Sequence, residues 1–331
     1  MRKVRVGLLG AGICANSFHW PALSTLKNRF EFVAFAGADA QQNRAYAQKT
    51  GIERVYTDFH DLIADAQVEA VISSYPYFLN EEILAASKSA GKSVFVEKPI
   101  AKSIEEATRM AAMDDGKVVM GVGENWLYWN TIPVVRALID AGEIGQVRLV
   151  QQFSYYNIDL EDPYMRGNAW RRTATGGMLL DRAVHAIALL RGLFGHVRRA
   201  TGNTACIRPE LGAFDTMTTL VEYDGGIKGT IINCASAREA ALPFSILILG
   251  TKGTIKIGDF MTKVVVSNEQ GSREIVVDNG TGGYDLEFLN FHEAITGAAA
   301  FKSDLRGARN DLFAALAAYE APGVWQQIEE I

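Results

Sequence analysis

The sequence predicts an α/β domain with a doubly wound parallel sheet, followed by an α+β domain with a large, open, mostly antiparallel sheet that has helices on one face. Three observations support this prediction. Short apolar runs alternate with helix-like stretches over residues 1–123, and a glycine-rich loop follows the first of these runs. From residue 124 the strand-like runs follow one another closely, with few helices between them. The length of 331 residues also favours two domains, since single cores rarely grow beyond about 250–300 residues.

The composition is that of an ordinary globular protein, with 48% hydrophobic and 21% charged residues and a net charge of −5. A nucleic-acid partner would need a clustered basic surface, and a membrane span would need about 18 consecutive apolar residues; neither is present in the sequence. We interpret residues 2–15 as the first strand and its loop rather than a signal peptide, because they begin a continuing strand–helix–strand pattern. Cys14, Cys206 and Cys234 are odd in number and widely spaced, which predicts no disulfide framework and a cytoplasmic location.

The elements of the first domain alternate in type. The runs rich in β-branched residues, which predict strands, are residues 4–9, 32–36, 70–74, 93–96 and 118–122. The helix-like stretches between them are residues 21–27, 41–49, 80–90 and 104–113. Because the strands are continuously apolar, we expect helices on both faces of a parallel sheet, as in a Rossmann fold.

The second domain begins with predicted helices and continues with strands. The helices cover residues 133–141 and 177–194. The strands cover residues 199–206, 216–223, 227–234, 244–249, 254–257, 263–267 and 273–277, separated by turn signals such as residues 224–226 (DGG). Two closing helices at residues 285–296 and 309–319 are candidates to pack back on the first domain.

The loop after the first strand reads GAGICA over residues 10–15 and precedes a predicted helix. Gly10 allows a tight turn, Gly12 lets the backbone approach a pyrophosphate, and the small Ala15 allows the helix to pack closely on the strand. The start of a helix also favours a bound phosphate. We therefore assign Gly10, Gly12 and Ile13 to dinucleotide binding, on the strand–loop–helix context more than on the spacing alone.

Asp39 ends the second predicted strand, where a carboxylate can accept hydrogen bonds from the adenosine ribose hydroxyls. An Asp at this point is also a favourable helix N-cap, and the two roles are compatible. A carboxylate repels the 2′-phosphate of NADP, and the following Ala40 supplies no cation. The sequence therefore favours NAD as the cofactor, with NADP as the alternative.

Lys98 stands at the end of the fifth predicted strand, within residues 97–99 (EKP). Because Pro99 disfavours helical dihedrals at Lys98, strand geometry continues to the carboxyl edge of the sheet, where ligands of open α/β sheets bind. Further along, Asp181 and His185 are four residues apart on one face of a predicted helix, after a double glycine that permits close approach of another element. The pair is either catalytic or a structural brace for that helix.

These segments resemble the glucose–fructose oxidoreductase, inositol dehydrogenase and rhizopine-catabolism (Gfo/Idh/MocA) family. The resemblance rests on residues 90–99 (AGKSVFVEKP), 141–147 (AGEIGQV) and 176–185 (GGMLLDRAVH), with weaker matches at 250–254 and 311–319, and it spans essentially the whole chain. It implies an NAD(P)-binding Rossmann domain over residues 1–123 and a substrate-binding and oligomerisation domain over residues 124–331.

The resemblance also implies a reaction, namely NAD(P)-dependent hydride transfer to or from a secondary alcohol or ketone of a sugar, inositol or related polyol. His185 is the candidate to move the hydroxyl proton, since the ordinary pKa of histidine lies near 6.5. Lys98 would hydrogen-bond the same oxygen and stabilise its developing negative charge. Asp181 would orient the substrate or His185.

Further pocket residues follow from the resemblance. The cofactor-binding set gains residues at or near strand ends, which are Ser74, Pro76, Asn80, Glu97, Lys98 and Asn125. Candidates for substrate contact are Trp126, Trp170 and Arg171, with core packing as the alternative for Trp170. The sequence departs from the family pattern at residues 75–80 (YPYFLN), beside the cofactor ribose, and at Ala183, where the family usually has glycine.

The expected partner is a small sugar or polyol, and the family together with a large open sheet implies a homodimer or homotetramer. No metal is expected, because the five histidines show no ligand spacing with Cys, Asp or Glu. Three other functions stay open: a glycosidase-like enzyme that oxidises its substrate transiently and retains NAD, a non-catalytic NAD-dependent sensor, and a reductase for a non-sugar ketone or tetrapyrrole. Net cofactor turnover separates the first of these from a dehydrogenase.

Overall fold

The computed structural model of the protein describes residues 2–166, 170–173, 176–237 and 244–329. The chain divides into two compact units, each built from two separate stretches of sequence. Unit 1 comprises Met1–Tyr128 and Thr281–Arg309, and unit 2 comprises Trp129–Gly280 and Asn310–Ile331. The chain therefore passes from one unit to the other at residues 128/129, 280/281 and 309/310.

Unit 1 is built on a parallel sheet of six strands. The strands are β1 (Val4–Leu9), β2 (Phe30–Ala36), β3 (Arg54–Tyr56), β4 (Ala70–Ser73), β5 (Ser93–Glu97) and β6 (Met120–Gly123). Their spatial order is β3-β2-β1-β4-β5-β6, so the direction of winding reverses between β1 and β4. This is the order of a Rossmann fold, in which ligands bind at the carboxyl ends of the strands beside the reversal.

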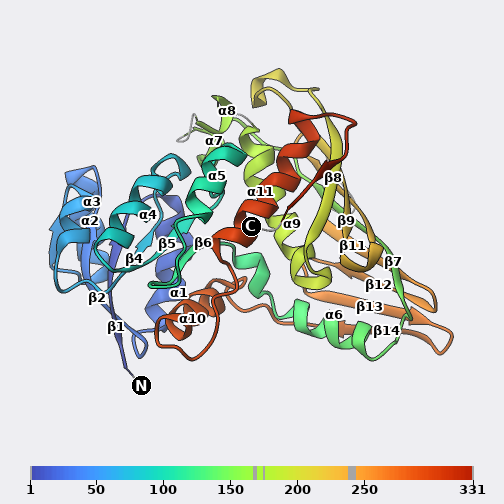
Figure 1. Ribbon diagram of the computed structural model, residues 1–331, viewed down its shortest axis with the longest axis horizontal. Coiled ribbons are helices and arrows are strands. Elements are labelled where there is room, and N and C mark those ends of the chain that lie inside the picture. Colours follow the sequence, from blue (N-terminus) through green and yellow to red (C-terminus); the bar gives the residue numbers. More distant parts are fainter. Residues whose placement is uncertain (1, 167–169, 174–175, 238–243, 330–331) are drawn as a thin grey trace. The chain divides into compact units, whose positions relative to one another are not determined.

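Helical elements accompany the strands of unit 1, and one of them, α10, comes from later in the chain (Figure 1). They are η1 (Ala15–His19), α1 (Trp20–Thr25), α2 (Ala40–Thr50), α3 (Phe59–Ala64), η2 (Tyr77–Leu79), α4 (Asn80–Ser89), α5 (Ile104–Ala111), η3 (Asn125–Tyr128) and α10 (Tyr284–Ile295). Element η1 is a π-helical turn that runs directly into α1. The side chains of Asp39, Asp58 and Ser103 cap α2, α3 and α5 by accepting hydrogen bonds from backbone amides of the first turn.

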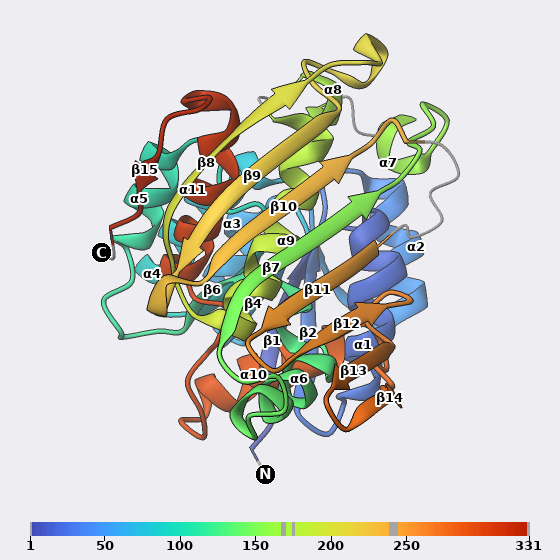
Figure 2. The ribbon, with the colours of Figure 1, turned by 90° about the vertical axis from the view of Figure 1, so that its right-hand side faces the viewer.

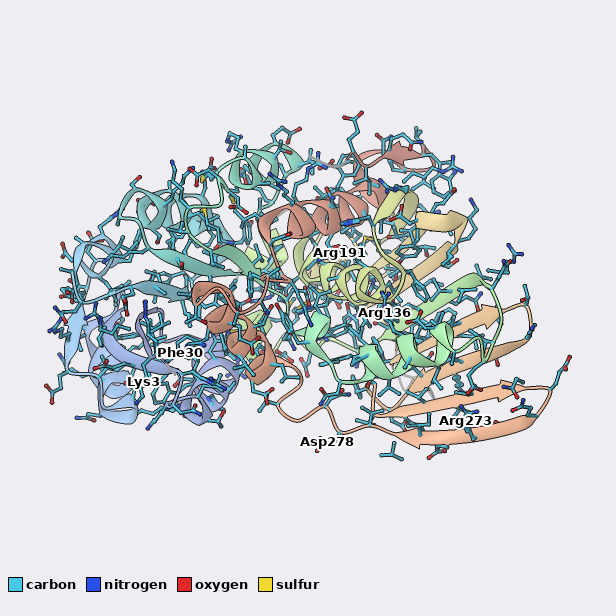
Figure 3. The ribbon with its side chains drawn as sticks, turned by 60° about the horizontal axis from the view of Figure 1, so that its bottom comes forward. Lys3, Phe30, Arg136, Arg191, Arg273 and Asp278 are labelled. Atoms are coloured by element: carbon cyan, nitrogen blue, oxygen red, sulfur yellow. The ribbon has the colours of Figure 1, made fainter. Side chains whose placement is uncertain are left out.

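Aromatic side chains fill the core of unit 1, and α10 supplies two of them. Phe288 and Phe291 are fully buried and pack against Phe95 of β5, with ring centroids 5.2 and 5.8 Å apart. Phe30, labelled in Figure 3, packs against the ring of His292 at 5.4 Å. Residues 281–309 therefore complete a core that the first 128 residues begin.

Unit 2 is built on a sheet of nine strands, seen face-on in Figure 2. They are β7 (Val147–Tyr155), β8 (Val197–Ala205), β9 (Thr216–Tyr223), β10 (Lys228–Cys234), β11 (Phe244–Gly250), β12 (Gly253–Gly258), β13 (Lys263–Asn268), β14 (Gly271–Val276) and β15 (Gln326–Gln327). The order is β14-β13-β12-β11-β7-β10-β9-β8-β15. Strands β7 and β10 pair in parallel, and the other neighbouring strands pair antiparallel.

Helices cover one face of this sheet, and α9 is the most buried of them. The helical elements are α6 (Thr131–Asp140), α7 (Pro163–Arg166), α8 (Trp170–Thr173), α9 (Gly177–Phe194), η4 (Pro209–Leu211), η5 (Asp224–Gly226) and α11 (Leu305–Glu320), which begins in unit 1. Helix α9 packs against β9 and β10. Arg191 of α9 donates two hydrogen bonds of 2.8 Å to Asp311 of α11, and both side chains are largely buried.

Strand β8 and helix α11 approach each other closely at Gly202. A Cβ atom at this position would lie 2.1 Å from the carbonyl oxygen of Thr218 on β9 and 3.0 Å from Cβ of Ala318 on α11. Gly258, at the end of β12, is a contrast, because no heavy atom lies within 4 Å of the place its Cβ would take. Only the first of the two glycines is therefore required by packing.

The predicted fold class is confirmed: a parallel Rossmann sheet precedes a larger, mostly antiparallel sheet. The elements that were not predicted include strand β3, helix α3 and strand β7. Strand β3 and helix α3 are short, at three and six residues. Strand β7 is long, but its buried face carries Val150, Gln152 and Ser154, so polar residues interrupt the expected apolar alternation. The burial is possible because Gln152 Nε2 donates to Ser154 Oγ at 2.6 Å.

Among the residues that the structure describes, none belongs to a helix both long enough and apolar enough to cross a membrane.

Candidate active site

The loop after β1 begins at the winding reversal of the unit 1 sheet. Gly10 has a φ of +90°, and a Cβ there would lie 2.7 Å from Ser74 Oγ, so this position requires glycine. Ser74, directly after β4, donates from its hydroxyl to the carbonyl oxygens of Leu9 (2.9 Å) and Gly10 (3.2 Å). These bonds tie together the two strand ends that flank the reversal. Pro76 follows in the same loop and precedes η2.

The middle of the loop is open. Gly12 is exposed, and no heavy atom lies within 4 Å of the place its Cβ would take. Helical structure begins at the next residue, Ile13, which is half-buried. An unobstructed backbone at the start of a helix fits the pyrophosphate of a dinucleotide.

Asp39 lies after β2 and caps helix α2. Its Oδ1 accepts a hydrogen bond of 2.7 Å from the amide of Gln42, and the residue is exposed. Since the cap engages Oδ1, the cap and a ribose contact through the other oxygen are compatible. The N-cap interpretation of this residue is confirmed.

Lys98 follows β5 at the carboxyl edge of the sheet and is half-buried. Its backbone amide donates to Glu97 Oε2 at 3.1 Å. Asn80, which is fully buried, donates from Nδ2 to the carbonyl oxygens of Glu97 (2.8 Å), Pro99 (3.2 Å) and Ile100 (3.1 Å). Asn80 was expected among the cofactor contacts, and in the structure its side chain holds the segment that carries Lys98.

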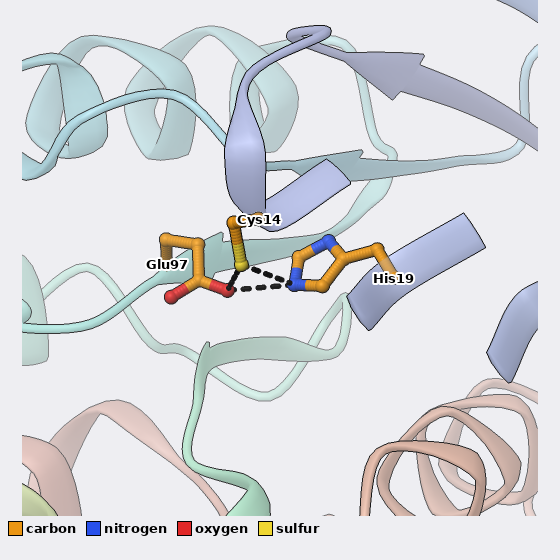
Figure 4. A group of neighbouring side chains, drawn as sticks. All are labelled: Cys14, His19 and Glu97. Carbon is orange, nitrogen blue, oxygen red and sulfur yellow. Dashed lines mark hydrogen bonds and ion pairs between the residues drawn. The ribbon is translucent and has the colours of Figure 1, made fainter. Parts of the chain in front are cut away.

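Glu97 also meets two side chains from the first helix (Figure 4). Its Oε1 lies 2.6 Å from His19 Nε2 and accepts a 3.1 Å hydrogen bond from the Cys14 thiol, while Cys14 Sγ and His19 Nε2 are 3.4 Å apart. Burial alone would raise the pKa of the Glu97 carboxyl, but the hydrogen bond from His19 and the charge of Lys98 outweigh burial and lower the pKa below its ordinary value. The sequence did not predict this cluster.

A second buried carboxyl, that of Glu287 on α10, lies near Glu97. Glu287 Oε1 accepts a short hydrogen bond from the backbone amide of Glu124, and no described group bonds to Oε2. Burial raises the pKa of Glu287 well above its ordinary value, and the carboxylates of Glu97 and Glu124 raise it further. The surroundings of Glu287 therefore favour the neutral form of its carboxyl group.

Asn125 and Trp126 lie in η3, after β6. Asn125 is buried, and its Nδ2 donates to the carbonyl oxygen of Gly282 at 2.7 Å. Trp126 is half-buried, with its backbone amide 3.3 Å from Glu124 Oε1. Asn125, predicted to bind cofactor, thus joins η3 to the returning segment before α10.

In unit 2 helix α9 begins at the double glycine. Gly176 and Gly177 have φ values of +77° and +47°, and a Cβ on Gly177 would lie 2.4 Å from the carbonyl oxygen of Arg171. The glycines therefore permit α8 to approach α9, as predicted. Asp181 and His185 follow within α9, one turn apart; Asp181 is buried and His185 is half-buried.

Asp181 has a defined partner, which is Arg171 of α8. Arg171 Nε donates to Asp181 Oδ2 at 3.2 Å, and both side chains are buried. The side chain of Trp170 lies outside the described residues. Ala183 is fully buried, so its extra methyl group packs in the core of unit 2.

Comparison with known proteins identifies the family. Residues 4–123 match the oxidoreductase family with an NAD-binding Rossmann fold, and residues 133–256 match the GFO/IDH/MocA C-terminal domain. The chain belongs to the Gfo/Idh/MocA family. It is an oxidoreductase, and NAD is its cofactor.

Relatives of this Gfo/Idh/MocA oxidoreductase include enzymes with named activities. A trans-1,2-dihydrobenzene-1,2-diol dehydrogenase of Mus musculus is 26% identical over 81% of this chain and 79% of its own. A 1,5-anhydro-D-fructose reductase of Ensifer adhaerens is 27% identical over 88% of each chain. Among solved structures, the WlbA dehydrogenase of Bordetella pertussis, in complex with NADH and UDP-GlcNAcA, is 25% identical over 99% of each chain, with a TM-score of 0.84.

Sequence reasoning overlooked several residues of this Gfo/Idh/MocA chain. His19 packs against Phe288, at a ring distance of 5.1 Å, and it also bonds to Glu97. Glu287 carried no signal in the sequence, because its neighbours Glu97 and Glu124 are more than 160 residues away along the chain. Only the return of residues 281–309 to unit 1 brings them together.

Proposed function

We propose that this oxidoreductase transfers a hydride between NAD and a secondary alcohol or ketone of a sugar, inositol or related polyol. The observation that carries the proposal is the placement of Lys98. It stands at the carboxyl edge of the Rossmann sheet, on a segment held by Glu97 and Asn80. Ligands of such sheets bind at this edge.

The cofactor-binding role is proposed for the loop residues Gly10, Gly12 and Ile13, with Asp39 accepting from the adenosine ribose. Ser74, Pro76 and Asn125 line the neighbouring strand ends, and Asn80 and Glu97 act by holding Lys98. The Asp39 carboxylate favours NAD over NADP, because it would repel a 2′-phosphate. When bound, the nicotinamide accepts or donates the hydride.

Three side chains carry the proton and charge chemistry in this proposal. His185 removes the hydroxyl proton during oxidation and returns it during reduction. Lys98 donates a hydrogen bond to the same oxygen and stabilises its developing negative charge. Asp181 orients the substrate or His185, and Arg171 keeps the Asp181 carboxylate in place.

The substrate class is supported by the relatives. The diol dehydrogenase and the anhydrofructose reductase are named for hydroxyl- or keto-bearing six-carbon compounds, and the WlbA structure contains a nucleotide sugar. We place Trp126, Trp170 and Arg171 at the substrate, since aromatic faces and guanidinium donors suit ring C–H groups and hydroxyls.

A panel of sugars, inositols, keto-sugars and cyclic diols, with NAD and NADP, identifies the substrate by the change in NADH absorbance. Sustained NADH formation with one of them is expected; cleavage of a glycoside without net NADH formation would overturn the proposal.

Replacement of His185 tests the assigned proton transfer. We expect His185→Ala to lower kcat by about 10²- to 10⁴-fold, because the hydroxyl proton loses its acceptor, while the Kd for NADH changes little. His60→Ala is the matched control, since His60 is exposed on α3 and its imidazole contacts the exposed Glu82. Equal losses of kcat and of NADH affinity in His185→Ala would contradict the assignment.

Two further expectations belong to this proposal. Cys14, Cys206 and Cys234 form no disulfide, which is consistent with a cytoplasmic location. The large open sheet of unit 2 suits a homodimer or homotetramer, which light scattering of the purified protein tests.

A further inference from the structure

We propose that Cys14, His19 and Glu97 form a binding site for a thiophilic divalent cation, with Zn²⁺ as the best match, and that this cation weakens the binding of NAD⁺. The second half rests on the proposed function, because it requires the nicotinamide to lie near Lys98. The site itself stands on the geometry of unit 1 alone.

The three side chains offer the right ligand atoms. They present one sulfur, one imidazole nitrogen and one carboxylate oxygen, all within 4.8 Å of one another. Zinc in proteins takes this mixture of ligands, whereas Mg²⁺ and Ca²⁺ take oxygen ligands almost alone. Three protein ligands would leave a fourth position for water or another small ligand.

The distances are close to those of a tetrahedral site. With Zn–S near 2.3 Å and Zn–N near 2.05 Å, tetrahedral geometry separates sulfur and nitrogen by about 3.6 Å. Cys14 Sγ and His19 Nε2 are 3.4 Å apart. The separations from Glu97 Oε1 are shorter, at 3.1 Å to the sulfur and 2.6 Å to the nitrogen. An ion would therefore replace the two hydrogen bonds to Oε1 and move that oxygen outward by less than about 1 Å.

Local structure explains why these residues meet. Cys14 and His19 are five positions apart, a spacing that an ordinary α-helix does not place on one side. Residues 15–19 form a π-helical turn, whose hydrogen bonds join positions five apart, so the two side chains turn toward the same point. Glu97, at the end of β5, completes the group from the adjoining sheet (Figure 4).

The histidine is held in place for ligation. His19 is 3% exposed, and its ring packs edge-on against Phe95 and Phe288, with centroids 6.0 and 5.1 Å away. A ring fixed in this way loses little conformational freedom when it binds an ion. The sequence-based expectation of no metal rested on the spacing of possible ligands along the chain. Such spacing reveals neither a π-helical turn nor a ligand that lies 83 positions away.

Charge balance predicts the effect on the cofactor. Binding of Zn²⁺ displaces the thiol proton of Cys14 to solvent, and the thiolate and the Glu97 carboxylate then neutralise the ion. With a neutral imidazole, the charge of the three side chains and ion rises from −1 to 0. Lys98 is next in sequence to Glu97, so the surroundings of Lys98 become less negative by one charge. This change disfavours binding of the positively charged nicotinamide of NAD⁺ more than binding of the neutral nicotinamide of NADH.

Metal titration of the purified protein, residues 1–331, tests the site. Chelator-treated protein is titrated with Co²⁺, which reports thiolate ligation by a charge-transfer absorption, and with Zn²⁺ by calorimetry. We expect one ion per chain, with loss of the charge-transfer band in Cys14→Ser and at least tenfold weaker Zn²⁺ binding in both Cys14→Ser and Glu97→Gln. Cys206→Ser, at an exposed cysteine, is the matched control and keeps both signals. Thermal unfolding in chelator checks that each variant is folded.

The outcomes are distinct. A charge-transfer band that survives in Cys14→Ser or disappears in Cys206→Ser, or Zn²⁺ binding weaker than millimolar, overturns the site. For the cofactor, we expect Zn²⁺ to raise the Kd of NAD⁺ several-fold more than that of NADH, and to do so in wild type but not in Cys14→Ser. Tight Zn²⁺ binding with no such difference overturns the effect on NAD⁺. Absence of NAD⁺ and NADH binding in metal-free protein would instead overturn the proposed function and leave the metal site standing.

Discussion

Glu287 is a carboxylic acid with no exposed surface, set among two other glutamates in unit 1. Burial raises the pKa of its carboxyl well above the ordinary value. Above about pH 4.3 the carboxyl therefore releases its proton more readily in the unfolded chain than in the folded protein. The unfolded state then binds fewer protons than the folded state. The contribution of Glu287 to stability is complete below that pH and is lost as the pH rises toward its folded pKa.

Glu287→Gln should remove this pH dependence. The amide oxygen can still accept the backbone hydrogen bond from Glu124, and the neutral side chain needs no proton. We expect the free energy of unfolding of the variant, minus that of wild type, to grow as the pH rises above about 4.3, by up to about 1.4 kcal/mol per pH unit, until the pH reaches the raised pKa of Glu287. Urea denaturation across this range measures it.

Glu293→Gln is the control, because Glu293 lies on the same helix and is only half-buried. The same urea series on Glu293→Gln measures what a Glu-to-Gln change on this helix does by itself. A difference for Glu287→Gln that stays flat with pH would contradict the raised pKa of Glu287.

The sequence predicted where several site residues lie in their elements, but it did not predict all of their contacts. Lys98 could be placed at a strand end because Pro99 follows it, and Asp181 and His185 could be placed on one helix face by their four-residue spacing. Arg171 was named for the substrate, but its bond to Asp181 depends on the approach of α8 to α9 at Gly177. Contacts of that kind are fixed by tertiary packing.

At the scale of elements, burial of polar side chains decided which strands could be predicted. Strands β1 and β9 were predicted with the bounds they have, because their apolar residues follow the period of a strand. Strand β7 was not predicted, since two of its three buried side chains are polar; one hydrogen bond joins them. Element η1 was not predicted, because no propensity rule predicts a π-helical turn.

The contact between β8 and α11 yields a stability prediction. Gly202→Ala places a methyl group against the Thr218 carbonyl and Ala318, and the backbone oxygen cannot move without disturbing β9. We expect the variant to lose about 3 kcal/mol of unfolding free energy. Gly258→Ala, with open space at its Cβ, should change stability by less than about 0.5 kcal/mol in the same denaturation experiment. Similar values for the two variants would mean that β8 and α11 are not packed as described.

At the scale of the whole molecule, each unit is assembled from two stretches of chain. The matched Rossmann family segment ends at residue 123, yet Phe288 and Phe291 belong to the core of unit 1. The predicted boundary, with the first domain ending at residue 123, rested on the change of pattern along the sequence, and such patterns do not record which core a later helix joins.

Fragments test this assembly. We expect residues 1–128 alone to lack a cooperative unfolding transition, because the core of unit 1 lacks α10. Residues 1–128 joined to residues 281–309 by a short Gly/Ser linker should unfold cooperatively in guanidinium, followed by near-ultraviolet circular dichroism. A short linker is sufficient, since Asn125 bonds to Gly282 and Tyr128 bonds to Asn290.

Phe288→Ala in the joined fragment should cost about 4 kcal/mol, as for other large buried aromatics. The same cooperative transition in both fragments would show that α10 is dispensable for unit 1.

The late return of α10 also has a consequence during synthesis. Residue 128 leaves the ribosome 167 residues before Ile295, the last residue of α10. At about 5–20 residues per second, the first 128 residues wait roughly 10 to 30 seconds for Phe288 and Phe291. Throughout that interval the apolar surface around Phe95 lacks its permanent cover. We therefore expect chaperone capture and premature aggregation to compete for the nascent chain until α10 emerges.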